Sequence, residues 1–198
     1  MKADLTRYHH WIFDLDGTLT QAVHDFKRMR GLLNIPLDED ILTHIERLPH
    51  PLRVAKKQHL DELERFYAEQ AQPAEGVYDL LVGLAERGVA LGIVTRNSKE
   101  LAHLSLNVLG IEKYFCSDHI IGRDEAIPKP HPDGLQRLMQ SWGVEPHQTL
   151  MVGDYKYDLL AGRAAGCSTL HITKSEERWP DMTDFHCETL AALALLIK

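Results

Sequence analysis

The sequence predicts an α/β fold: a doubly wound parallel sheet that is covered by helices on both faces and carries a small helical insertion. Three observations support this prediction. Short apolar runs with strand character recur five times along the 198 residues. Helical patterns separate the last four runs, and strands that alternate with helices of this length form parallel sheets. A longer, charged, helix-like segment follows the first run and indicates a module inserted after the first strand.

The first strand is expected over residues 11–13 and the others over 89–94, 119–121, 149–152 and 168–172. Between the last four strands, apolar residues recur at helical spacing. They form one face from Leu101, Leu104, Val108 and Leu109, a second from Leu135, Leu138, Met139 and Trp142, and a weaker third from Leu159, Leu160, Arg163 and Ala164.

The insertion has no convincing strand between Leu19 and Gly76. Helix-like runs cover residues 26–33, 41–48 and 54–70, and Pro49-His50-Pro51 interrupts them in the middle. The segment 72–76 closes the insertion, and a helix over 77–87 then leads back to the sheet through Gly88. A last helix is expected over 189–197.

Composition and charge exclude several classes of protein. The net charge of −7 argues against a general nucleic-acid binder. The sequence has no apolar run of about 18 residues, so no membrane span is expected. The N-terminus lacks the apolar region of a signal peptide, and Cys116, Cys167 and Cys187 are too few and too scattered for a disulfide framework, which together favour the cytoplasm. The twelve histidines form no zinc-binding pattern.

The most informative motif is Asp14-Leu15-Asp16-Gly17-Thr18, directly after the first strand. Two carboxylates two residues apart point the same way along an extended chain and repel each other unless a cation lies between them. A hard, oxygen-binding cation such as Mg²⁺ suits such a site. A calcium loop is excluded because its glycine and glutamate positions fall on Leu19 and Asp25. An ordinary turn stays open from this segment alone.

Three further clusters follow predicted strands. Thr95 ends the second strand beside residues that start a helix, where its hydroxyl and free N–H groups suit an anion, although a plain helix cap has the same pattern. Lys129 stands between prolines, which indicates either a cation held in a fixed position or simply a stiff loop with an incidental lysine. Asp154 and Asp158 lie one helical turn apart and suit a metal ligand backed by a second carboxylate, or a capping Asp with solvated neighbours. All four clusters fall at carboxyl ends of strands, where a doubly wound sheet binds its ligands.

These motifs together resemble the haloacid dehalogenase-like (HAD) hydrolase superfamily, from Trp11 to about Gly166. The resemblance implies a Rossmann-like sheet with strand order 5-4-1-2-3. The insertion resembles the C1 cap of the phosphoglycolate phosphatase-like branch, and Lys129-Pro130-His131-Pro132 is typical of that branch. The core would then comprise residues 1–19 and 76–198, and the cap residues 20–75.

The resemblance also implies roles for the motif residues. Asp14 would attack phosphorus, and Asp16 would protonate the leaving alcohol and then activate water. Mg²⁺ would be held by Asp14, Asp16 and Asp154, with Asp158 orienting the metal shell. The transferred phosphoryl group would contact the substrate-binding residues Leu15, Asp16, Thr95, Arg96 and Lys129.

Several departures narrow the chemistry. Asp16 disfavours carbon–halogen cleavage, because the superfamily's dehalogenases lack this second acid. The Asp-Lys-Thr-Gly-Thr motif and the membrane spans of the superfamily's transport ATPases are both absent from the sequence. Lys56 and Lys57 lie in the cap but match no imine-forming pattern of the phosphonatases.

The cap is expected to close over the site and contact the leaving group. Its proline-containing turn is the expected inward loop and offers Arg47, His50 and Arg53, although a solvated turn has the same composition. The predicted substrate is a small phosphorylated metabolite, with no nucleic-acid or membrane partner, and the predicted activity is Mg²⁺-dependent hydrolysis of a phosphomonoester. A phosphosugar mutase with the same core, or a phosphate-binding protein without turnover, are the alternatives.

Overall fold

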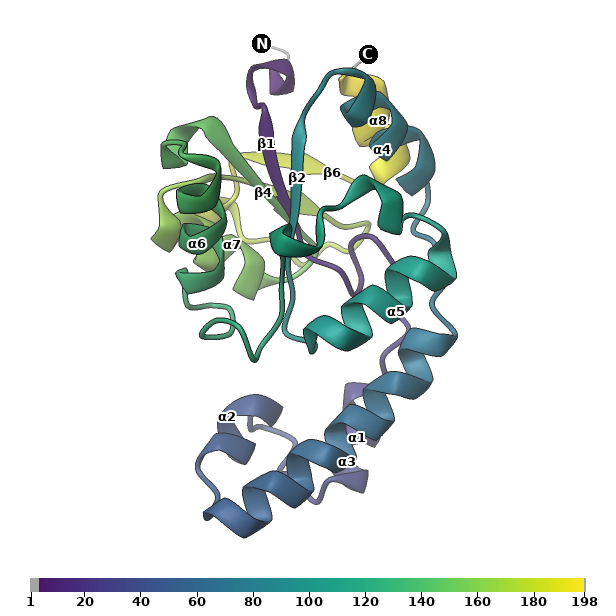
Figure 1. Ribbon diagram of the computed structural model, residues 1–198, viewed down its shortest axis with the longest axis vertical. Helices are drawn as coiled ribbons and strands as arrows, with labels where there is room; N and C mark the ends of the chain where they lie inside the picture. Colours follow the sequence, from purple (N-terminus) through teal and green to yellow (C-terminus); the bar gives the residue numbers. More distant parts are fainter. Residues whose placement is uncertain (1–3, 198) are drawn as a thin grey trace.

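The computed structural model describes residues 4–197 and contains an α/β core with a helical extension at one end (Figure 1). Short 3₁₀ turns connect several of the elements. The chain runs through β1 (His10–Phe13), α1 (Phe26–Leu32), α2 (Ile41–Glu46), α3 (His50–Glu69), α4 (Val77–Glu86), β2 (Ala90–Val94), α5 (Lys99–Leu109), β3 (Ile120–Ile121), α6 (Asp133–Trp142), β4 (Thr149–Gly153), α7 (Lys156–Ala165), β5 (Ser168–Ile172), β6 (Phe185–Cys187) and α8 (Leu190–Leu196).

The sheet is parallel throughout its described strands, in the order β3-β2-β1-β4-β5-β6. The predicted α/β class is confirmed. The order differs from the predicted 5-4-1-2-3 by a sixth strand, β6, which extends the sheet beyond β5. β6 is not predicted from the sequence because it has three residues, of which only Cys187 is buried, so neither an apolar run nor an alternation is long enough to detect.

The sheet is covered on both faces because successive side chains of a strand point to opposite sides. Trp11 and Phe13 of β1 belong to the larger apolar cluster, which also includes residues of α4, α5 and α8. Ile12 points the other way, into a second cluster with α6 and α7. Figure 1 shows these two sets of helices on opposite sides of the sheet. The side chains of Trp11, Ile12 and Phe13 are fully buried, and each contributes about 1.5–3 kcal/mol to stability.

The strand register brings the carboxyl ends of β1, β2 and β4 to one edge of the sheet. Phe13 lies beside Ile93 and Val152, and the Asp14 N–H donates to the Val152 carbonyl oxygen at 2.9 Å. The residues after these strands therefore meet at the end of the sheet that faces the helical extension, while the start of β1 and helix α8 lie at the opposite end (Figure 1).

The extension is formed by α1, α2 and α3 and has its own apolar cluster, composed of Met29, Leu33, Ile35, Ile41, Ile45 and Leu60. We refer to residues 20–75 as the cap. Two neighbouring segments connect it to the core: Thr20 forms an antiparallel bridge with Pro73, and the Ala74 N–H donates to the Leu19 carbonyl oxygen at 3.0 Å. The division into a core of 1–19 and 76–198 and a cap of 20–75 stays a prediction.

One cap helix begins earlier than predicted. The run expected to start at residue 54 starts at His50, and Pro49 is its N-cap residue. Pro51 lies in the first turn of α3, where proline is tolerated because its missing N–H would have no partner within the helix. The two prolines therefore begin a helix of 20 residues rather than form a loop of their own.

Among the residues that the structure describes, no helix combines the length and the apolar character needed to cross a membrane.

Candidate active site

The loop after β1 presents Asp14 at the centre of the site and brings Thr18 back toward it. Gly17 makes this turn with φ of +97°, and a Cβ there would lie 2.5 Å from Oδ2 of Asp154. Glycine is therefore required for both the backbone conformation and the close approach. The Thr18 hydroxyl donates to Oδ1 of Asp154 at 3.1 Å and so links this loop to the one after β4.

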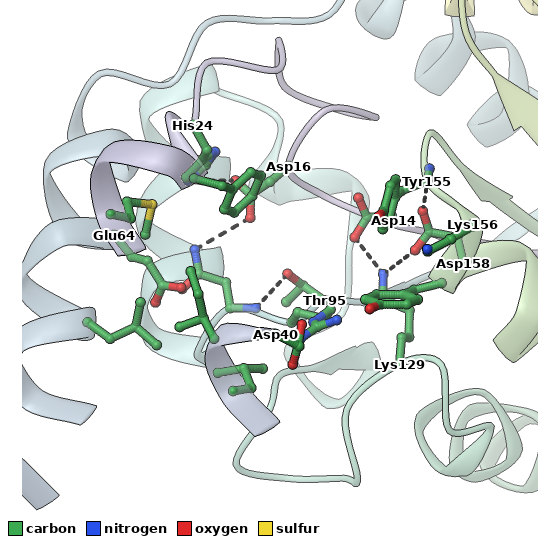
Figure 2. A pocket seen from close by; sticks show the side chains of 18 of the residues that line it. Asp14, Asp16, His24, Asp40, Glu64, Thr95, Lys129, Tyr155, Lys156 and Asp158 are labelled. Carbon is green, nitrogen blue, oxygen red and sulfur yellow. Dashed lines mark hydrogen bonds and ion pairs between the residues drawn. The ribbon is translucent and has the colours of Figure 1, made fainter. Parts of the chain in front are cut away.

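Lys129 lies in the loop between β3 and α6 and reaches the same point. Its Nζ atom lies 2.6 Å from Oδ1 of Asp14 and 2.7 Å from Oδ1 of Asp158, and its side chain is 1% exposed. Figure 2 shows the ammonium group between the two carboxylates. The prolines around Lys129 thus accompany a cation that is held in a fixed position.

Asp154 and Asp158 come from the end of β4 and the first turn of α7. A Cβ on Gly153 would lie 2.3 Å from Cβ of Asp158, so the chain needs glycine here to bring the Asp158 side chain into the site. Oδ2 of Asp158 accepts a hydrogen bond from the Tyr155 N–H at 3.0 Å. One oxygen each from Asp14, Asp154 and Asp158 lie within 4.8 Å of one another.

The electrostatics of this acidic group are unfavourable without a further cation. Burial raises the pKa of Asp14, although the Lys129 ammonium opposes that rise. Burial, followed by repulsion from Asp14 and Asp158, holds the pKa of Asp154 well above its ordinary value. Burial also raises the pKa of Asp158 to about 6. Three carboxylates beside one ammonium group provide the all-oxygen ligand set that a hard divalent cation prefers, so the residues fit a divalent metal ion.

Asp16 faces a different part of the site. Its Oδ2 atom accepts a hydrogen bond from the Asn97 amide at 3.5 Å, and its Oδ1 atom lies 3.9 Å from Nε2 of His24 in the cap. Burial raises the pKa of Asp16 to about 6 and lowers that of His24 to about 4, so His24 is neutral at pH 7. The Asp16 carboxylate is not part of the three-carboxylate group, which leaves its backbone carbonyl as the atom that could bind a metal.

The loop after β2 also lines the site. Thr95 is buried, and its hydroxyl oxygen accepts a hydrogen bond from the Asn97 N–H at 3.0 Å. The Arg96 side chain leaves this loop toward the cap, where its Nη2 atom lies 2.7 Å from Oδ2 of Asp40. Leu15 is fully buried, so only its backbone can face a ligand.

Core and cap together line one pocket with a volume of about 530 Å³. Core residues Asp14, Asp16, Thr95, Lys129 and Asp154 line it on one side. The cap contributes apolar and charged residues to the other side: His24, Phe26, Met29, Arg30, Asp38, Glu39, Asp40, Ile41, Leu42, Leu60 and Glu64. Figure 2 shows Asp14, Lys129 and Asp158 at one end of this pocket and Asp16, His24 and Glu64 at the other.

The structure does not bring the predicted cap residues to this pocket. Arg47, His50 and Arg53 are absent from its lining, and Arg53 pairs instead with Glu46 at 3.2 Å. The reason is the early start of α3, which turns these residues into the junction of two helices. Lys56 and Lys57 of the cap also have partners outside the pocket, since Lys56 bonds the Leu33 carbonyl oxygen and Lys57 pairs with Asp124.

A buried cation that the sequence did not predict, Arg123, lies at the junction of cap and core. The Arg123 side chain, 3% exposed, lies 2.7 Å from Oε2 of Glu64, pairs with Asp61, and donates to the Arg96 carbonyl oxygen at 3.1 Å. Burial raises the pKa of Glu64 to about 7 despite this pairing. No motif marks Arg123 in the sequence, because its partners on α3 lie about 60 residues away.

Comparisons with known proteins agree with this geometry. Residues 11–172 match the haloacid dehalogenase-like hydrolase family. The chain is 37% identical to the pyrophosphatase PpaX of Oceanobacillus iheyensis, over 88% of each chain. It is 34% identical to phosphoglycolate phosphatase of Escherichia coli O157:H7, over 80% of this chain and 61% of that protein.

Solved structures share the fold. A hydrolase from Pseudomonas syringae has a TM-score of 0.77 at 22% identity, over 94% of this chain and 95% of the other. A predicted phosphoglycolate phosphatase from Haemophilus somnus has a TM-score of 0.74 at 21% identity, over 98% and 100%. The prediction of a phosphatase-type hydrolase is confirmed, and the chain belongs to the haloacid dehalogenase-like hydrolases, in the branch that resembles phosphoglycolate phosphatases.

Proposed function

We propose that this protein hydrolyses small phosphomonoesters with the help of Mg²⁺, through a phosphoryl group carried on Asp14. The observation that supports this most directly is the meeting of Asp14, Lys129, Asp154 and Asp158 at the carboxyl ends of parallel strands. A nucleophilic carboxylate, a fixed ammonium and a pair of ligand carboxylates are the parts that phosphoryl transfer requires. A Mg²⁺ ion held by Asp14, Asp154 and the Asp16 carbonyl would neutralise the oxygens of the phosphoryl group.

In the first step, a carboxylate oxygen of Asp14 attacks phosphorus, and the bond between phosphorus and the leaving oxygen breaks. Lys129 offsets the repulsion between Asp14 and the incoming phosphate, because its ammonium already contacts Oδ1 of Asp14. The Thr95 hydroxyl and the Arg96 N–H, which follow β2, would hold the remaining phosphoryl oxygens.

Asp16 supplies and recovers the proton. With a pKa raised to about 6, a fraction of Asp16 is protonated near neutral pH and can donate to the leaving alkoxide. The resulting carboxylate then removes a proton from the water that attacks the phosphorylated Asp14. Water oxygen ends in inorganic phosphate, Asp14 is regenerated, and Asp16 holds a proton again.

The test is phosphate release from a panel of small phosphomonoesters and inorganic pyrophosphate, with and without Mg²⁺. Asp14→Asn, which keeps the shape but lacks the nucleophile, is the control. Metal-dependent release that disappears in Asp14→Asn supports the proposal. Conversion of a phosphosugar to its isomer without net phosphate release would instead indicate the mutase, and binding of phosphate without any turnover would indicate a binding protein.

We also propose the cytoplasm as the compartment. The three cysteines are free, and two of them, Cys167 and Cys187, are buried thiols. Burial raises the pKa of Cys167 to about 12, so this thiol stays protonated and unreactive. The labelled protein's distribution after cell fractionation tests this proposal.

A further inference from the structure

Arg96 places a second cation in the pocket, separate from Lys129. Its guanidinium carbon lies 4.7 Å from the centre of the Tyr157 ring, which it faces. Its Nη2 atom lies 2.8 Å from Oδ1 and 2.7 Å from Oδ2 of Asp40, the residue that precedes α2. All three residues line the pocket, so the cation is held by one group from the core and one from the cap.

The Arg96 guanidinium has hydrogen-bonding capacity left over. Within residues 4–197, hydrogen bonds from this side chain use Nη2 alone, and Nε and Nη1 donate to no protein atom. The other cations that line the pocket have contacts of their own: Lys129 contacts Asp14 and Asp158, Arg30 donates to the carbonyl oxygens of Phe26 and Glu39, and the Lys156 ammonium lies over the Tyr155 and Tyr157 rings. Arg96 is therefore the guanidinium that is free to bind an additional group in the pocket.

The contact with Asp40 shows what kind of group fits there. A carboxylate from the cap occupies the position in front of the guanidinium, and Arg favours planar anions such as carboxylates and phosphates. The pair is only partly buried, with side chains 25% and 27% exposed, so a competing anion can reach it. Two other acids of the same pocket are paired with different cations: Glu39 with His44 and Glu64 with Arg123.

We propose that Arg96 binds an anionic group on the leaving part of the substrate, and that Asp40 is an internal counter-ion which this group displaces. This inference rests on the proposed phosphatase function and narrows its substrates to phosphomonoesters with a second anionic group, a carboxylate or a second phosphate. Thr95 and Arg96 are adjacent in the chain. The Thr95 hydroxyl and the Arg96 N–H would therefore hold the transferred phosphoryl group, while the Arg96 side chain would bind the leaving group.

A substrate series of matched size tests the inference. 2-Phosphoglycolate carries a carboxylate, 2-hydroxyethyl phosphate has a neutral hydroxymethyl group at the same place, and ethylene glycol bisphosphate carries a second phosphate. We expect kcat/KM to be higher for the anionic substrates than for the neutral one. Whichever anionic substrate has the larger kcat/KM identifies carboxylate or phosphate as the preferred group.

Two variants then assign the preference to residues. In Arg96→Gln, we expect the preference for the anionic substrate to fall about tenfold or more, since a charge-assisted hydrogen bond is lost from that substrate alone. In Asp40→Asn, we expect the preference to rise severalfold through a lower KM, because the competing charge is gone. Asparagine still caps α2 by accepting from the Thr43 N–H, so the helix is kept.

Arg65→Gln is the matched control. It breaks another pair between cap and core, with Glu100, away from the pocket lining. This variant should leave the ratio of the two kcat/KM values as in the wild type. If Arg96→Gln or Asp40→Asn also left the ratio unchanged, the Arg96–Asp40 pair would be a tether only, and the inference would be overturned. Absence of turnover with every substrate would instead overturn the phosphatase proposal and the inference with it.

Discussion

Replacing Lys129 by methionine tests how the acidic group is held together. Methionine keeps an unbranched side chain of similar length but removes the ammonium that contacts Asp14 and Asp158. Burial by itself would lower the pKa of Lys129, but Asp14 and Asp158 outweigh that effect and raise it, so the wild-type residue is charged. In Lys129→Met, the buried carboxylates of Asp14 and Asp158 lose the cation that they share, while the partly buried Asp154 stays beside them.

The magnitude follows from the burial of the pair. Removal of one partner from a buried ion pair costs about 3–5 kcal/mol, because the remaining charge is left in a poorly solvated place. The total stability of a folded domain is about 5–15 kcal/mol, so Lys129→Met removes a large part of it. For a chain of this size, the melting temperature should fall by about 6–20 °C.

Mg²⁺ should restore much of this loss. Without Lys129 the group carries one more negative charge, so a divalent cation should bind it more tightly and stabilise the variant more than the wild type. The assay is thermal and urea unfolding with EDTA or with Mg²⁺, independent of catalysis. Lys174→Met, which breaks an exposed pair with Glu75, is the control and should change stability little. A Lys129→Met protein as stable as this control in EDTA would refute the reasoning.

Two further variants test the backbone of the site and the junction with the cap. Gly17→Ala should lower stability by about 1–3 kcal/mol and reduce turnover, because the added Cβ would lie 2.5 Å from Oδ2 of Asp154. The control is Gly143→Ala, where φ is also positive but no atom lies near the added Cβ. In urea unfolding, this control should show only the cost of the backbone conformation. Glu64 has a folded-state pKa of about 7, above its ordinary 4.5, so the fold favours the protonated form and the contribution of Glu64 to stability should fall by about 3 kcal/mol as pH rises from 4.5 to 7. Glu64→Gln should lack this decrease, and parallel unfolding curves for the two proteins across that range would contradict the assignment.

The sequence predicted most of the core because each of the first five strands contains an apolar run. Trp11, Ile12 and Phe13 are buried on both faces of the sheet, so all three are apolar and the strand is visible without alternation. β6 has no comparable signal. Its position depends on pairing with β5, where Leu170 lies beside Phe185, and the intervening residues 173–184 contain no strand that would point to that pairing.

The residues that the core contributes to the site could be predicted for the same reason. Asp14, Thr95 and Asp154 directly follow strands, so the parallel register alone determines that they meet. The cap side could not be predicted, because its residues face the pocket through the packing of three helices. From the sequence, the proline-containing turn is expected to face the site. The cap residues that do line the pocket, such as His24 and Asp40, instead lie just before helices, where they resemble ordinary helix caps.

The cap joins the core largely through charge rather than through apolar packing. Its apolar cluster contains no core residue, while ion pairs cross the junction at Arg96–Asp40, Arg123–Glu64 and Arg65–Glu100. Movement of the cap would therefore break ion pairs but leave both apolar interiors intact, and water can replace the exposed pairs at little cost. Arg123 is the exception, because its buried guanidinium would have to be solvated or paired anew. The three named pairs join residues 35 to 59 positions apart and follow no period, which is why only the folded structure reveals them.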